Sequence, residues 1–84
     1  MQKNRKISII GGGSWGTAIA YLLANNDYNI KLYVRNEKLK NNINNKHVNN
    51  LYFSEKKLPE NIVATTDLEN SIKKPLILFD LILS

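Results

Sequence analysis

Short apolar runs alternate along the chain with stretches in which apolar residues recur every three or four positions. The apolar runs predict strands at residues 6–10, 30–34, 62–65 and 76–83. The stretches between them predict helices at residues 14–26, 37–44 and 66–73. The polar segment 47–60, which contains Pro59, is expected to be a loop. Strand and helix therefore alternate from the first apolar run to the last.

This alternation predicts the α/β class with a parallel sheet. A strand, a helix and a second strand follow one another within about 30 residues, the length of a βαβ unit. We expect a partial doubly wound (Rossmann) sheet of about four strands and three helices. Asn36 is expected to cap the second helix, and Thr66 with Glu69 fits a capping box for the third. The first helix carries helix-spaced apolar residues at Trp15, Ala18, Ile19, Leu22 and Leu23.

Length and composition narrow the range of functions. The chain has 84 residues, enough for one small domain. It has no cysteine and a single histidine, His47, which excludes thiolate chemistry and argues against a metal site. The net charge is +5, but the lysines are scattered and no aromatic residues alternate with them, so nucleic-acid binding is not expected. No apolar run is long enough for a signal peptide or a membrane span, so a cytoplasmic location is expected.

The first predicted strand leads into a cluster of glycines. Gly11, Gly13 and Gly16 have the G-x-G-x-x-G spacing of a dinucleotide-binding turn, with a strand before it and a helix after it. In such a turn the first glycine allows a sharp bend, the second allows close approach to a pyrophosphate, and the third allows tight helix packing. Ser14 and the start of the helix then offer hydrogen-bond donors to the phosphates. The alternative is a plain glycine-rich turn.

The end of the second predicted strand holds a candidate for recognition of the ribose. Folds that use NAD place an acidic residue about 20 positions after the glycines. Residues 33–36 contain no acid, and Arg35 stands there instead. An arginine at this position can pair with the 2′-phosphate of NADP, which favours NADPH. Glu37 remains a rival partner for the ribose hydroxyl and keeps NADH open, while Arg35 could also be a solvated loop residue.

Two blocks of the sequence resemble one family. The first, GGGSWGTAIA at residues 11–20, is similar to the opening of bacterial NAD(P)-dependent glycerol-3-phosphate dehydrogenase. The second resembles that family's pattern H-x-N-x-x-Y, L-P-x-N-I, A-T-x-D-L, through His47, Asn49, Tyr52 and the run 58–68. The resemblance covers about residues 6–72. Phe53 departs from the family's usual Leu-Pro after the tyrosine, and the sequence from Lys73 onward fits poorly.

The resemblance implies an oxidoreductase that reduces dihydroxyacetone phosphate to sn-glycerol 3-phosphate for phospholipid synthesis. It implies cofactor contacts at Ser14, Trp15, Arg35 and Tyr52, a homodimer for a full-length chain, and no catalytic residue within residues 1–84. We therefore expect the N-terminal part of a dinucleotide-binding domain, without the substrate domain and inactive alone. The rival hypotheses are a stand-alone nucleotide-binding module and a non-functional remnant of a decayed gene.

Overall fold

The computed structural model describes residues 6–11, 13–51, 53–54, 56–71 and 76–78. The predicted alternation of strand and helix is confirmed in them. The elements follow one another as β1 (Lys6–Ile10), α1 (Ser14–Ala24), β2 (Asn29–Tyr33), α2 (Glu37–Lys46), β3 (Ile62–Thr65), α3 (Leu68–Ser71) and β4 (Leu76–Leu78).

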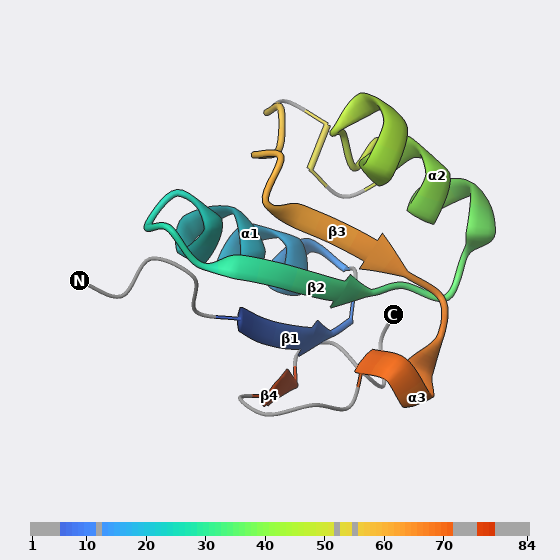
Figure 1. Ribbon diagram of the computed structural model, residues 1–84. Helices are drawn as coiled ribbons and strands as arrows, with labels where there is room; N and C mark the ends of the chain where they lie inside the picture. Colours follow the sequence, from blue (N-terminus) through green and yellow to red (C-terminus); the bar gives the residue numbers. More distant parts are fainter. Residues whose placement is uncertain (1–5, 12, 52, 55, 72–75, 79–84) are drawn as a thin grey trace.

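The strands form one parallel sheet in the order β3-β2-β1-β4 (Figure 1). Ile9 is in register with Leu32, and Leu32 with Ala64. Because side chains alternate between the faces of a strand, these residues form an apolar row across one face. The strand order, with β1 between β2 and β4, is that of a doubly wound sheet at the start of its second half. The predicted fold class is confirmed.

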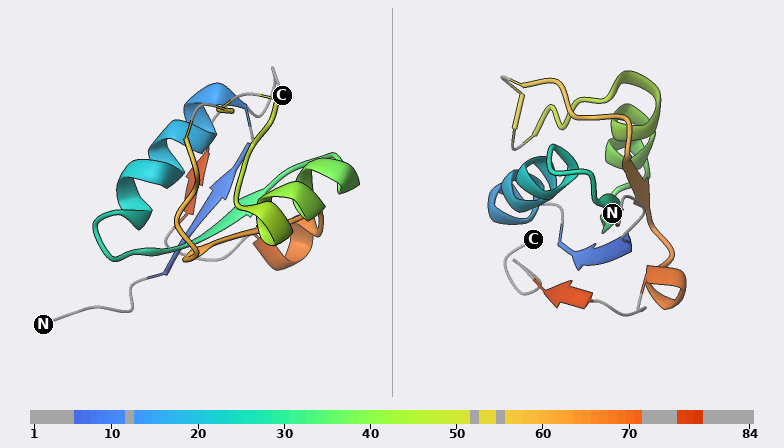
Figure 2. Two further views of the ribbon diagram at one scale, coloured as in Figure 1. Left: turned by 90° about the horizontal axis from the view of Figure 1, so that it is seen from above. Right: turned by 60° about the vertical axis from the view of Figure 1, so that its left-hand side comes forward.

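The core lies between the apolar rows of the sheet and the two longer helices. Ala20 of α1 and Ile43 of α2 are both fully buried in it. Leu58 joins the same core from the loop that follows α2. Figure 2 shows α1 lying alongside β1. Parallel strands connected through helices bury their apolar face in this way, because each crossover returns over the sheet.

The buried face of α1 differs from the one that its apolar spacing predicts. Trp15 is 68% exposed and Leu22 is 56% exposed. The residues that α1 buries are small: Gly16, Thr17, Ala20 and Ala24. Small side chains let the helix axis approach the strands closely, so the larger residues lie on its flanks and outer side. Apolar spacing therefore identified the helix correctly, but it did not identify which residues the helix buries.

A left-handed residue ends α2, and another lies in the turn that follows α1. A turn follows Ala24, and within it Asp27 has φ 71°. His47 follows α2 with φ 59° and donates its backbone N–H to Ile43. Asn36 caps α2 as predicted, since its side chain accepts hydrogen bonds from the N–H groups of Lys38 and Leu39.

The third helix begins later than its predicted capping box. Its first residue is Leu68, so the N-cap position falls on Asp67 and not on Thr66. The Thr66 hydroxyl donates instead to Glu37, 3.1 Å away. The prediction of a capping box from Thr66 to Glu69 was therefore wrong. The last strand is described at residues 76–78, and the remainder of the predicted run, 79–83, lies outside the described residues.

Two asparagine side chains tie β3 to its surroundings. Asn44 of α2 donates to the Ala64 carbonyl at 2.9 Å and accepts from the Ala64 N–H at 2.7 Å, as a neighbouring strand would. Asn61 donates to the carbonyls of Ala24 and Tyr28 at 2.8 and 2.7 Å. The first contact occupies the outer edge of β3, and the second joins the start of β3 to the end of α1.

Candidate functional site

The glycine turn connects β1 to α1 through a left-handed residue. Gly11 has φ 124°, a conformation that residues with a Cβ rarely adopt. Its N–H donates to the Tyr33 carbonyl at 3.1 Å, which fixes the turn to the carboxyl end of β2. The sharp bend predicted for the first glycine of the motif is therefore present at Gly11.

Steric crowding explains why residue 16 is a glycine. A Cβ at this position would lie 1.9 Å from the Gly11 carbonyl oxygen, far inside van der Waals contact. Gly16 is buried in the first turn of α1. The motif predicts close packing at its third glycine. In this chain Gly16 brings α1 against the turn itself, at Gly11.

Gly13 begins α1 as a residue without a side chain. It is the N-cap in extended conformation, with φ −74° and ψ −170°, and no side-chain hydrogen bond caps the helix. The first turn of α1 contains no acidic residue. The Gly13 carbonyl accepts the Thr17 N–H at 2.9 Å, so the helix is regular from its first turn. A helix start with no capping side chain and no carboxylate fits an anion such as a pyrophosphate.

Ser14 and Trp15 follow Gly13 and are both exposed. Arg35 is also exposed, and it lies just beyond Tyr33, to which the turn is hydrogen-bonded. The fold thus brings the glycines, Ser14, Trp15 and Arg35 to the carboxyl ends of β1 and β2. Doubly wound sheets bind their ligands at this edge. Tyr52, the remaining residue predicted for the site, lies outside the described residues.

Glu37, the rival partner for the ribose, has other interactions. Its carboxylate accepts the Thr66 hydroxyl and pairs with Lys40. The hydrogen bond from Lys40, followed by that from Thr66, lowers the pKa of Glu37 below its ordinary value of 4.5. Both partners favour the charged carboxylate, and they hold it towards the connection between β3 and α3.

One contact at this edge was not foreseen from the sequence. The Asn49 side chain donates to the Thr17 hydroxyl at 2.8 Å, and both residues are fully buried. Phe53 lies near Tyr21 of α1, with 5.4 Å between the ring centroids. The loop that follows α2 is therefore packed on the helix that begins at the glycine turn. Sequence separation hides the pairing, since Asn49 and Thr17 are 32 positions apart.

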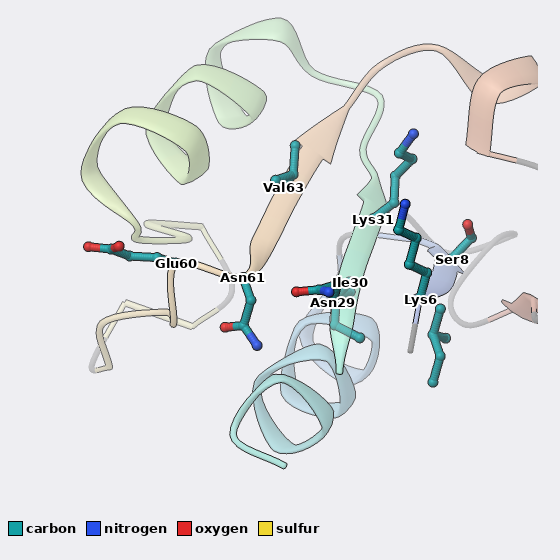
Figure 3. Close-up of a pocket in the computed structure, with 9 residues that line it drawn as sticks. Lys6, Ser8, Asn29, Ile30, Lys31, Glu60, Asn61 and Val63 are labelled. Carbon is teal, nitrogen blue, oxygen red and sulfur yellow. The ribbon is translucent and has the colours of Figure 1, made fainter. Parts of the chain in front are cut away.

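A hollow of about 500 Å³ lies elsewhere on the sheet (Figure 3). Its lining includes Lys6, Asn29 and Asn61, which stand at or just before the amino ends of their strands. Lys6 and Lys31 extend in the same direction from neighbouring strands. Because the glycine turn lies at the carboxyl ends, the hollow is separate from the candidate dinucleotide site.

The described residues offer little for other classes of site. They contain no group of three or more His, Asp or Glu residues that could hold a metal ion. Within the same part of the chain, no helix has the length and apolar character needed to cross a membrane.

Comparison with known proteins gives one consistent result. The family model for the NAD-dependent glycerol-3-phosphate dehydrogenase N-terminus matches residues 6–82. Glycerol-3-phosphate dehydrogenase [NAD(P)+] of Halothermothrix orenii is 55% identical over 74 residues, covering 88% of this chain and 22% of that protein. The Bacillus licheniformis enzyme of the same name is 48% identical over 67 residues, covering 80% and 19%.

A solved structure agrees with these relatives. The crystal structure of glycerol-3-phosphate dehydrogenase from Coxiella burnetii superposes with a TM-score of 0.79 at 29% identity, covering 92% of this chain and 24% of that one. The chain spans about a fifth of the length of the curated relatives just named.

Proposed function

Since this chain belongs to the family of the NAD-dependent glycerol-3-phosphate dehydrogenase N-terminus, we propose that it binds a nicotinamide dinucleotide at the carboxyl ends of β1 and β2. Residues 1–84 then form the N-terminal part of a dinucleotide-binding domain. The reaction that this domain serves is the reduction of dihydroxyacetone phosphate to sn-glycerol 3-phosphate. The dinucleotide supplies the hydride, and the residues of this chain hold and orient it.

The glycine turn carries this proposal. Gly11 is left-handed, Gly13 begins α1 without a capping side chain, and Gly16 packs the helix against the turn. In the proposal, the pyrophosphate lies against the backbone of Gly11 and Gly13 and accepts hydrogen bonds from the start of α1 and the Ser14 hydroxyl. Trp15 offers an exposed indole for an apolar part of the cofactor.

Tyr52 is assigned to the cofactor only through the family resemblance. It follows Leu51, whose N–H is bonded to the Asn49 side chain. The proposal makes it a further contact with the dinucleotide. No residue of this chain is assigned a catalytic role.

We also propose that NADPH is preferred to NADH, and that Arg35 carries the preference. Arg35 is exposed at the edge where the turn lies. A guanidinium can pair with a 2′-phosphate through two parallel hydrogen bonds. Glu37 is bonded to Lys40 and to Thr66 of the connection between β3 and α3, whereas the 2′-phosphate of NADPH would need a cation such as Arg35.

Calorimetric titration of the chain with NADPH and with NADH tests both proposals. In Gly13→Ala, the added Cβ intrudes on the pyrophosphate, so NADPH affinity should fall strongly. In Arg35→Ala, NADPH affinity should fall about 10- to 150-fold and NADH affinity should stay nearly the same. Lys31→Ala is the matched control, because it removes one positive charge beside the hollow and away from the turn.

Two results would contradict these proposals. Equal NADPH affinities of wild type and Gly13→Ala would rule out binding at the glycine turn. Equal wild-type affinities for NADPH and NADH would rule out the role of Arg35, and Glu37 would then be the better partner for the ribose.

A further inference from the structure

The loop that follows α2 is joined to the start of α1 by a chain of hydrogen bonds. The Asn49 side chain donates to the Thr17 hydroxyl at 2.8 Å. The Thr17 N–H in turn donates to the Gly13 carbonyl at 2.9 Å. Gly13 is the N-cap of α1. A path of three residues therefore leads from the interior of the loop to the residue at which the proposed pyrophosphate site begins.

Asn49 also organises the loop itself. Its side-chain oxygen accepts the Leu51 N–H at 3.1 Å, and its backbone carbonyl accepts the Phe53 N–H at 2.9 Å. One side chain thus holds the loop with its oxygen and the helix with its nitrogen. Because an amide has separate donor and acceptor atoms, both bonds form at the same time.

Burial makes the contact between loop and helix specific. Asn49 and Thr17 are both 0% exposed, so water cannot replace either partner when one is removed. The ring contact between Phe53 and Tyr21 lies one helical turn further along α1. The loop therefore rests on α1 at two successive positions of one face, and the polar position is the one nearer the glycine turn.

We propose that Asn49 is a positioning residue of the dinucleotide site, which acts through Thr17 on the first turn of α1. The inference rests on the proposed function. Asn49 holds the loop and the helix start in one arrangement, so that the donors which begin α1 are fixed before the cofactor binds. Pre-organised donors bind more tightly, since less ordering is needed on binding.

The test compares three variants of the chain. Thr17→Val removes the hydroxyl with little change in shape, and Thr17→Ser keeps the hydroxyl. Asn61→Ala is the matched control: it removes an asparagine with two hydrogen bonds at the other end of α1, to Ala24 and Tyr28. This control should lower stability without changing the dinucleotide site.

Two measurements are made on each variant. The first is amide hydrogen exchange of Leu51 and Phe53 without ligand, which should rise about tenfold in Thr17→Val and stay near wild type in Thr17→Ser. The second is NADPH affinity, at a temperature where circular dichroism shows every variant folded. It should fall about five- to tenfold in Thr17→Val, recover in Thr17→Ser and stay unchanged in Asn61→Ala.

The outcomes separate this inference from the proposed function. Unchanged exchange at Leu51 and Phe53 in Thr17→Val overturns the inference, whatever the affinities are. Raised exchange with an unchanged NADPH affinity overturns it too, because the contact then holds the loop without affecting the site. A weakening in Asn61→Ala as large as that in Thr17→Val assigns the effect to general stability and overturns it as well. If exchange rises in Thr17→Val but the wild-type chain binds neither NADPH nor NADH, then the contact of Asn49 with Thr17 holds the loop and the proposed function is overturned.

Discussion

Gly16 makes the glycine turn intolerant of any side chain at its helical end. The position at which its Cβ would stand is 1.9 Å from the Gly11 carbonyl oxygen. That oxygen belongs to a residue held at φ 124° and hydrogen-bonded through its N–H to Tyr33. Neither partner of the contact can move without disturbing the sheet or the helix.

Gly16→Ala should therefore destabilise the chain, although alanine is ordinarily the better helix former. We expect a loss of about 1–3 kcal/mol, the usual range for overpacking a buried position. Thermal unfolding followed by circular dichroism measures it, and a loss of 1 kcal/mol lowers Tm by about 4–8 °C in a domain of this size. Ser14→Ala, at an exposed position of the same helical turn, is the control. A Gly16→Ala variant that melts with the wild type would show that the turn relaxes.

The glycines could be predicted from the sequence, because each acts through the absence of a side chain and their spacing is local. The partnership of Asn49 with Thr17 could not, because it joins residues 32 positions apart and any of several nearby asparagines could have made it. The buried face of α1 could not be read from apolar spacing for a related reason. Apolar spacing identifies a helix, but the small residues Gly16 and Ala20 decide which side of it reaches the sheet.

At the scale of elements, the strands and longer helices could be predicted because apolar periodicity determines them. The end of α2 depends on one residue in an unusual conformation. His47 follows this helix with φ 59°, which apolar periodicity does not reveal. The start of α3 differs from the prediction, and the Thr66 hydroxyl that a capping box would use donates to Glu37, a contact between distant residues.

The edge of β3 depends on one side chain of α2. The Asn44 side chain donates to the Ala64 carbonyl at 2.9 Å and accepts from the Ala64 N–H at 2.7 Å. Unpaired strand edges promote pairing between chains. Asn44→Ala should therefore lower stability by about 1–3 kcal/mol, the cost of leaving partly buried backbone groups unsatisfied, and should increase association.

Denaturant unfolding and light scattering test this together. Asn45→Ala is the control, because Asn45 is the exposed neighbour on the same helix. Equal stabilities of the two variants would mean that water replaces the Asn44 amide at the edge of β3.

At the scale of the whole molecule, several large apolar side chains face solvent. Leu22 is 56% exposed on α1, and Val63 is 51% exposed on β3. Trp15 and Leu51 are exposed to a similar degree, at 68% and 57%. Apolar surface of this kind favours association, since burying a leucine contributes about 1.5–3 kcal/mol.

We expect the chain to self-associate as its concentration rises, and we expect Leu22→Lys to weaken the association without lowering stability. The weight-average mass from light scattering, measured over a range of concentrations, gives the result. Asn41→Lys adds the same charge at an exposed position of α2 and is the control. If Asn41→Lys reduces the mass as much as Leu22→Lys does, net charge and not the leucine governs the association.

The amide of Asn44 also limits where a further strand can pair with the sheet. A parallel sheet is enlarged by adding a strand to an outer member, and among the described residues the outer members are β3 and β4. Beside Ala64, the Asn44 side chain of α2 already makes the hydrogen bonds that an added strand would make. A further strand that paired with β3 would have to displace the Asn44 side chain from Ala64. The glycine turn lies away from that edge, because it follows β1, which β2 separates from β3.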